Sequence, residues 1–242
     1  MLSEYAERSR QVIYDQKWRL LTQRARLFRF IPFIEGALGA GSLAVGNVQA
    51  SSDLDVLVLA RAGRIFTARF FSVLAFSILG WRRSKLDHHI SAVDKICLNH
   101  FITPAAYRFA LPQHEYWRAL YQGLTPVYGS EPTIAAFFAA NKDWTGTVFW
   151  QGDSRHVHQD SATSKRLCER LLSGRLGSWF ERVIKKIQVS RIEHGLRHQR
   201  DQHRTIIFAA ESKGESQELP PLIRYTDTEL EFHPEPAVIE SR

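Results

Sequence analysis

The sequence predicts an α/β (α+β) fold, in which a small mixed β-sheet is covered by helices and followed by a mainly helical C-terminal region. Two observations predict it. In the first 140 residues, short apolar runs of strand length alternate with segments of helical period. From residue 163 to about 204 the apolar residues instead keep a period near 3.6, which is typical of long amphipathic helices.

Length and composition indicate a folded protein. The chain has 242 residues, enough for one large domain or two small ones. Its hydrophobic content of 44%, with 12% aromatic residues, supports a packed core and argues against global disorder. The net charge of +7 favours phosphorylated or polyanionic partners.

The first half of the chain is expected to alternate helices and strands. A helix over 3–30 has one apolar stripe and is ended by Pro32. The expected order then is a strand at 34–40, a short helix at 43–46, a strand at 53–59, a helix at 64–80 and a strand at 95–102. Helices follow at 104–110, 113–123 and 131–140, with a loop through Pro126 and Gly129 before the last of them.

The second half divides by composition. A core with its N-terminal helix is expected over 1–140, a polar linker over 141–162, a basic helical region over 163–210 and an acidic, partly disordered tail over 211–242. The basic region reads as one long helix or a helix pair, with Gly174 and Gly177 as candidate breaks. Residues 205–210 and 230–233 are expected to form two short strands.

The sequence favours a cytoplasmic location. The polar N-terminus does not resemble a signal peptide, and the most apolar stretch, 65–81, is short for a bilayer span and contains Arg69. A membrane partner is therefore not expected. Cys97 and Cys168 show no metal-binding spacing, so we interpret both as buried thiols in a reducing compartment.

The motif that carries chemistry lies between the first two expected strands. Gly41 and Ser42 are followed ten residues later by Asp53 and Asp55, which open an unbroken apolar run. Residues i and i+2 of a strand point to the same face, so the two carboxylates project together about 6–7 Å apart. A divalent cation relieves their repulsion, and hard oxygen ligands suit Mg2+, which fills its shell with water and substrate phosphates.

This arrangement resembles the DNA polymerase beta-type nucleotidyltransferase superfamily. The hallmark there is an apolar strand, a Gly-Ser or Gly-Gly pair, about ten residues, and an Asp-x-Asp that opens a second strand. Residues 37–42 and 53–58 follow this order. The segment is also similar to small stand-alone bacterial and archaeal nucleotidyltransferase-domain proteins. The resemblance is strong over about 34–60 and extends to about 103.

The resemblance implies roles for four residues. Gly41 and Ser42 would contact the triphosphate of a nucleotide, since glycine lets the backbone approach the phosphates and the hydroxyl donates one more hydrogen bond. Asp53 and Asp55 would bind Mg2+ (or Mn2+). The implied activity is transfer of a nucleoside monophosphate from an NTP to a hydroxyl acceptor, with release of pyrophosphate. The acceptor class stays open among small molecules, proteins and RNA.

Members of the superfamily carry a third acidic residue on a later strand. The expected strand at 95–102 has no carboxylate inside it. Asp94, at its entrance, is the first candidate for a third catalytic carboxylate. Asp87 lies on the preceding loop, and Asn99 would be a neutral replacement. This departure from the pattern motivates a second hypothesis, a catalytically weak or inactive nucleotide-binding or regulatory module, as in toxin–antitoxin pairs.

Other readings of the same residues fit less well. In phosphatases of the haloacid dehalogenase type the Asp-x-Asp follows its apolar strand, whereas here it precedes it. A metal-dependent glycosyltransferase gives no role to a Gly-Ser pair ten residues earlier. Arg61, Arg64 and Lys85 are the cations considered for the triphosphate. The basic helices over 164–204 pack behind the core or bind a polyanion.

Overall fold

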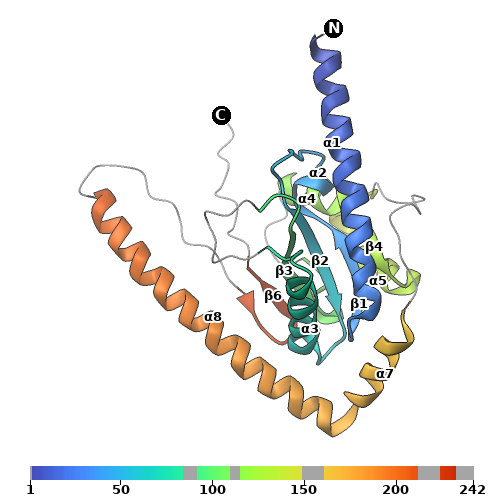
Figure 1. Ribbon diagram of the computed structural model, residues 1–242, viewed down its shortest axis with the longest axis vertical. Helices are drawn as coiled ribbons and strands as arrows, with labels where there is room; N and C mark the ends of the chain where they lie inside the picture. The colour runs from blue at the N-terminus through green and yellow to red at the C-terminus, as the bar shows by residue number, and fades with distance from the viewer. Residues whose placement is uncertain (1, 84–91, 110–114, 149–160, 212–223, 233–242) are drawn as a thin grey trace.

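The chain has an α+β fold in a computed structural model that describes residues 2–83, 92–109, 115–148, 161–211 and 224–232 (Figure 1). The strands of the described part are β1 (Ile34–Gly39), β2 (Leu54–Ala60), β3 (Ile96–Ile102), β4 (Thr125–Gly129), β5 (Arg224–Tyr225) and β6 (Glu229–Glu231). They form one mixed sheet in the order β4-β1-β2-β3-β6-β5. Strands β2 and β3 run parallel, and the other neighbours run antiparallel.

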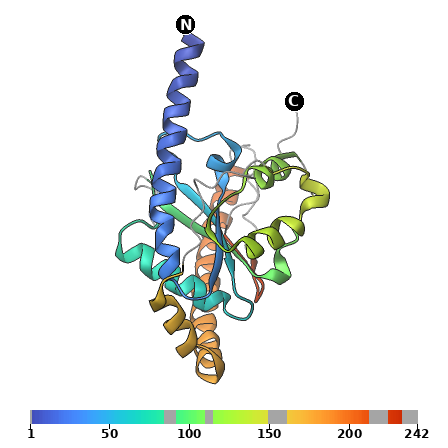
Figure 2. The ribbon, with the colours of Figure 1, turned by 90° about the vertical axis from the view of Figure 1, so that its right-hand side faces the viewer.

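Helices cover both faces of this sheet (Figure 2). The α-helices of the described part are α1 (Leu2–Ala25), α2 (Gly41–Val45), α3 (Ile65–Ile78), α4 (Glu115–Gly123), α5 (Glu131–Ala139), α6 (Lys142–Thr145), α7 (Thr163–Leu171) and α8 (Gly174–Glu211). The described part also contains two 3-10 helices, η1 (Arg26–Phe30) after α1 and η2 (Pro104–Ala106) after β3. Within the described residues, none of the helices combines the length and apolarity needed to cross a membrane.

Two hydrophobic cores lie on opposite faces of the sheet. One contains apolar residues of α1, η1 and α3, such as Leu21, Phe28 and Phe66, and it takes Val56 and Val58 from β2. The other takes alternate residues of the same strands and is closed by aromatic side chains of α4, α5 and α6, which are Tyr121, Phe137 and Trp144. The period of two along β2 therefore assigns its side chains to two cores.

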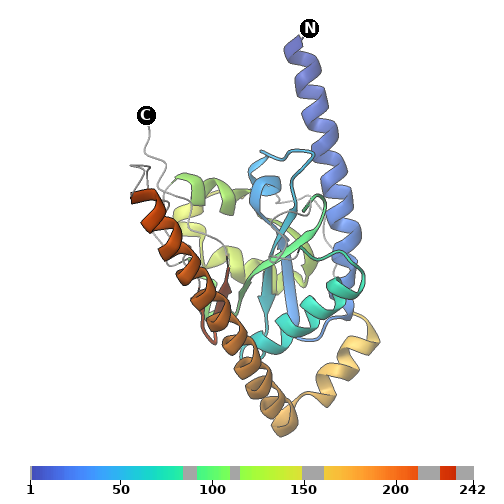
Figure 3. The same cartoon turned by 60° about the vertical axis from the view of Figure 1, so that its left-hand side comes forward.

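Helices α7 and α8 meet at an elbow, and α8 crosses α3 (Figure 3). The Glu181 carboxylate on α8 accepts hydrogen bonds from the backbone N–H groups of Phe66 and Thr67, at 2.9 and 2.8 Å. These donors belong to the first turn of α3, where N–H groups lack partners within their own helix. Buried Lys165 on α7 donates to Tyr128 Oη at 2.7 Å, which ties α7 to β4.

Most of the expected elements are confirmed, with shifts of a few residues. The expected strands at 34–40, 53–59 and 95–102 correspond to β1, β2 and β3. The expected helices at 3–30, 64–80 and 131–140 correspond to α1 with η1, α3 and α5. In the basic region the helix pair is confirmed and its break lies at Gly174, whose φ is +75°.

Four expectations about local structure are wrong. Residues 125–129 form an edge strand rather than a loop, because an edge position tolerates the missing N–H of Pro126. Residues 205–210 extend α8 rather than form a strand, since nothing interrupts the helix there and each further residue adds a hydrogen bond without a new nucleus. The expected helix at 104–110 is only the short η2, and the expected linker at 141–162 includes α6.

A buried asparagine explains the early end of η2. The Asn141 side chain accepts a hydrogen bond from the Phe109 N–H and donates to the Tyr107 carbonyl, at 3.0 and 2.7 Å. These backbone groups are therefore used outside a helix. In the expected tail, β6 confirms the strand near 230, whereas β5 was not expected. The described residues exclude 212–223 and 233–242 of the tail, 149–160 of the linker, and 110–114.

Candidate functional site

The two aspartates lie at the start of β2, next to the turn that follows β1. Asp53 directly precedes β2 and Asp55 is its second residue. The expected alternation is confirmed, because Leu54, Val56 and Val58 point into the core beneath α1 and α3. The Asp55 side chain therefore points to the opposite face of the sheet. Both aspartates are half-buried, so they keep some contact with solvent.

The Gly-Ser turn is in direct contact with the second carboxylate. Gly41 has φ +61°, a conformation that glycine adopts without steric cost. A Cβ added to Gly41 would lie 2.0 Å from Asp55 Oδ2, so only a residue without a side chain fits here. The Ala40 N–H donates to the Asp55 carbonyl at 3.0 Å, which holds the turn against β2. Gly41 and Ser42 open α2.

Helix α2 has five residues, too few for an appreciable helix dipole. The turn still offers the backbone N–H groups of a first helical turn, which have no partner within the helix, and the half-buried Ser42 hydroxyl. These are hydrogen-bond donors for an anion, and they lie beside two carboxylates that attract a cation. The combination suits a metal–phosphate ligand better than either ion alone.

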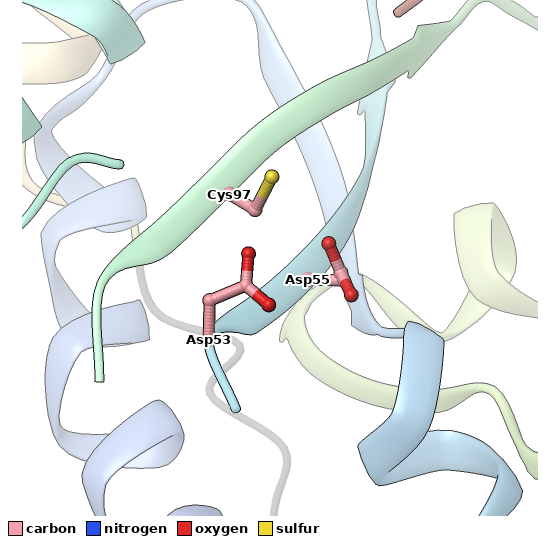
Figure 4. A group of neighbouring side chains, drawn as sticks. All are labelled: Asp53, Asp55 and Cys97. Atoms are coloured by element: carbon pink, nitrogen blue, oxygen red, sulfur yellow. The ribbon is translucent and has the colours of Figure 1, made fainter. Parts of the chain in front are cut away.

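Cys97 forms a group of three potential metal ligands with Asp53 and Asp55. It lies opposite Asp55 in the parallel pair of β2 and β3. The ligand atoms of Asp53, Asp55 and Cys97 all lie within 4.8 Å of one another, and Figure 4 shows the three side chains converging from the two strands. Burial, followed by the charges of Asp55 and Asp53, raises the pKa of the Cys97 thiol. The thiol is therefore neutral at neutral pH.

Of the residues considered for the third-ligand role, Asp94 does not join this group, whereas Asn99 lies next to it. Asn99 is buried on β3 and donates through Nδ2 to the Cys97 sulfur. Asp94 instead accepts from Lys17 Nζ at 2.9 Å. Lys17 is itself 5% exposed and also donates to the carbonyls of Ala50 and Ser52. Asp94 thus helps to fix α1 to the loop that leads into β2. Asp87 lies outside the described residues.

We expect Asp94→Asn to lower the stability of the protein without changing its dependence on Mg2+. Asp94 has φ +63°, and asparagine tolerates this conformation equally well, so only the charge is removed. The partly exposed pair with Lys17 should contribute about 1 kcal/mol. Thermal unfolding and a Mg2+ titration of nucleotide binding measure the two effects. A marked loss of Mg2+ affinity would assign Asp94 to the metal site after all.

An arginine lies against the first carboxylate. Arg83 Nη1 donates to Asp53 Oδ2 at 2.5 Å, and the Arg83 N–H donates to the Ile96 carbonyl, which anchors its backbone to β3. Burial alone would lower the pKa of Arg83, but the hydrogen bond to Asp53 and the nearby negative charges outweigh it and raise the pKa. The Arg83 side chain is 44% exposed, so its guanidinium borders the solvent at the site.

Arg83 and Tyr116 were not among the residues selected from the sequence. Arg83 lies in a basic turn directly after the apolar helix, and that turn is the sequence feature that could have pointed to Arg83. Tyr116, in the first turn of α4, has a pKa that is raised by burial and by the charge of Asp55. No pattern in the sequence marks Tyr116, because α4 reaches the site only through the fold.

The arginines considered earlier are used elsewhere. Arg61, just after the far end of β2, pairs with Glu35 and Glu169 at 3.0 Å. Arg64 lies over the Phe33 ring and donates to Ser178. These contacts join α7 and α8 to the sheet. Lys85 lies outside the described residues.

A second cluster of potential ligands, on β3 and β6, is already neutralised. His100, Glu229 and Glu231 place their ligand atoms within 4.8 Å of one another. Arg224 contacts Glu229 at 3.3 Å and Glu231 at 4.0 Å. Although burial would raise the pKa of Glu229, its bonds to His100 and Arg224 lower it. We interpret this cluster as the polar link that attaches β5 and β6 to the sheet.

Comparisons with known proteins do not add to this picture. No family model, curated protein or solved structure matches the chain. The chemistry of the site is therefore argued from its residues.

Proposed function

We propose that the protein is a Mg2+-dependent nucleotidyltransferase that moves a nucleoside monophosphate from an NTP to a hydroxyl acceptor and releases pyrophosphate. One observation carries the proposal: the Asp55 carboxylate lies against Gly41, where any side chain would collide with it. The carboxylates and the Gly-Ser turn are thereby parts of a single site. This contact joins the two halves of the motif that the sequence separates by ten residues.

The donor set fits a hard divalent cation. Asp53 and Asp55 supply carboxylate oxygens, and Mg2+ usually takes one or two carboxylates and completes its octahedron with water and phosphate oxygens. When bound, Mg2+ (or Mn2+) would neutralise charge on the phosphates and on the attacking oxygen. The role of the protein in this proposal is to hold the carboxylates and the turn in a fixed relation.

The other residues of the site have matching roles. The N–H groups of Gly41 and Ser42 and the Ser42 hydroxyl donate to phosphate oxygens. Once a cation neutralises the Asp53 carboxylate, the Arg83 guanidinium donates to a phosphate oxygen instead of to Asp53. The exposed side chain of Arg83 allows this change of partner. The acceptor hydroxyl attacks the α-phosphorus and forms a new P–O bond while the bond to the leaving pyrophosphate breaks. The proton of the hydroxyl passes to a carboxylate or to solvent.

The acceptor is a small molecule, a protein side chain or an RNA end, and we propose a cytoplasmic location where NTPs are abundant. Cys97 and Cys168 are both free thiols, as a reducing compartment requires, although Cys168 is only half-buried.

A second candidate function is a nucleotide-binding module that does not turn over. Cys97 favours it, because a neutral thiol stands where the superfamily resemblance implies a third carboxylate. A thiol in this place leaves the site with one hard oxygen ligand fewer for Mg2+. Binding of nucleotide would then serve regulation or recognition of a partner chain.

Pyrophosphate release separates the two functions. The protein would be incubated with each of the four NTPs and Mg2+ or Mn2+, with and without mixtures of small-molecule, protein and RNA acceptors, while NTP binding is measured in parallel. We expect metal-dependent release that disappears in the Asp53→Ala/Asp55→Ala variant. Tight NTP binding without release in every mixture would support the module, and the absence of both would refute the nucleotide site.

A further inference from the structure

The α7–α8 elbow exposes an apolar surface that the core does not use. We call the outer side of residues 163–187 the elbow surface. Five large apolar side chains on it are between 47% and 65% exposed, namely Leu167, Leu171, Leu176, Trp179 and Ile187. The inward side of the same helices packs on the body of the protein through residues such as Phe180 and Ile184. Exposed leucine and tryptophan at this density indicate an interaction site.

The apolar side chains form a stripe on each helix. Leu167 and Leu171 are four residues apart on α7, and on α8 Leu176 and Trp179 are three apart, so each pair shares a helix face. Ile187 lies eleven residues beyond Leu176, about three helical turns, and returns to nearly the same face as Leu176. Leu171 and Leu176 stand on either side of the break at Gly174, and both are exposed.

A row of cations accompanies this stripe. The exposed basic side chains on the elbow surface are Arg166, Arg170, Arg175, Arg182 and Lys186. No carboxylate of the described residues lies within ion-pair distance of any of them. Residues 166, 170, 175 and 186 each directly precede one of the exposed apolar residues. The cations therefore border the apolar stripe on both helices.

The acidic residues of the elbow are turned inward. Glu169 accepts from the Phe33 N–H at 2.7 Å and from Arg61 at 3.0 Å. Glu181 is hydrogen-bonded to the first turn of α3. The outward side of residues 163–187 therefore presents cations and apolar groups and no anion. This separation follows from the fold, since the sequence alone interleaves Glu169 and Glu181 with the arginines.

We infer that the elbow surface docks on an anionic lipid bilayer. Helices that lie in the plane of a membrane interface combine an apolar face, which enters the headgroup boundary, with Lys and Arg beside it, and tryptophan is favoured at that depth. The charge complementarity argues for this occupant. A nucleic acid would match the cations, but its interfaces are polar and leave leucine and isoleucine without a partner. Interfacial docking requires no membrane-spanning helix.

Vesicle co-sedimentation with the full chain tests this inference, which does not depend on the proposed function. We expect the protein to bind vesicles that contain phosphatidylglycerol at least about tenfold more tightly than pure phosphatidylcholine vesicles. The triple variant Arg170→Gln/Arg175→Gln/Arg182→Gln should weaken this binding by about 100-fold, because each cation near an anionic surface contributes roughly fivefold. In the wild type, brominated lipid should quench tryptophan fluorescence, and Trp179→Phe should lose most of that quenching.

The matched control removes three exposed arginines from another helix. Arg8→Gln/Arg10→Gln/Arg19→Gln on α1 changes the net charge by the same amount and leaves the elbow intact. We expect it to bind anionic vesicles nearly as well as the wild type. Equal loss of vesicle binding in both triple variants would refute the inference, because it would show that binding depends only on net charge. Absence of vesicle binding, or binding of RNA in its place, would also overturn it.

Discussion

Replacing Gly41 by alanine is expected to slow pyrophosphate release by roughly 100-fold and to weaken NTP binding. The added Cβ would lie 2.0 Å from Asp55 Oδ2 and 2.8 Å from its Cγ, far inside van der Waals contact. Either the turn or the carboxylate must then move by an ångström or more. A displacement of that size in a catalytic group costs roughly 100-fold in rate. Pyrophosphate release and the affinity for NTP, measured at saturating Mg2+, report the two effects.

Gly46→Ala is the matched control for this prediction. Gly46 follows α2 and has φ +80°, so alanine there bears the same left-handed strain, about 1–2 kcal/mol, as alanine at position 41. However, a Cβ on Gly46 has nothing within 4 Å. Both variants should lose stability through this strain, Gly41→Ala more so because of its contact with Asp55, and only Gly41→Ala should lose activity and binding. Equal activity in the two variants would contradict the view that the turn and Asp55 form one site.

The predictable part of the site is the part encoded locally. The position of Asp53 and Asp55 on one side of β2 follows from the period of two in an apolar strand, and the turn at Gly41 follows from its composition. Their contact also needed the antiparallel pairing of β1 with β2, which the connection over residues 40–53 does not by itself determine. The α+β fold could be predicted for the same reason, because segments with strand and helix periods alternate along the chain.

The third member of the group was not predictable, because it depends on register between distant strands. Cys97 lies opposite Asp55, but the pairing of β2 with β3 shifts between Asp55 and Leu57. A one-residue irregularity moves every later side chain to the other face. From composition alone, Cys97 is an ordinary buried thiol, and Asp94 at the strand entrance is the nearest carboxylate.

Features that depend on packing between distant segments could not be predicted from the sequence, for related reasons. Strand β4 contains Pro126 and ends at Gly129, residues that break most strands, and only its place at the sheet edge makes it acceptable. Arg83 meets Asp53 because the chain after α3 pairs with β3. The inward orientation of Glu181 likewise depends on how α8 crosses α3. Each of these features is set by packing between segments that the sequence separates by tens of residues.

Replacing Cys97 by aspartate is expected to improve Mg2+ binding and to increase turnover. The Cys97 sulfur lies within 4.8 Å of oxygens of both aspartates, so a carboxylate in its place would add a hard ligand where a neutral thiol now stands. Mg2+ prefers oxygen ligands to thiols. The Mg2+ concentration that gives half-maximal NTP binding should fall by roughly tenfold, which corresponds to about 1.4 kcal/mol. Without Mg2+ the variant should be less stable than the wild type, because three neighbouring carboxylates repel one another.

Cys97→Asn separates charge from shape in this experiment. Asparagine has the size of aspartate but carries no charge, so it should disturb the packing of β3 similarly and should not improve Mg2+ affinity. If both variants titrate alike with Mg2+, Cys97 does not face the metal and the third position lies elsewhere. If Cys97→Asp gains Mg2+ affinity and pyrophosphate release together, the thiol is what limits catalysis in the natural chain. A gain in NTP binding without release would favour the nucleotide-binding module, since a complete ligand set would still not produce transfer.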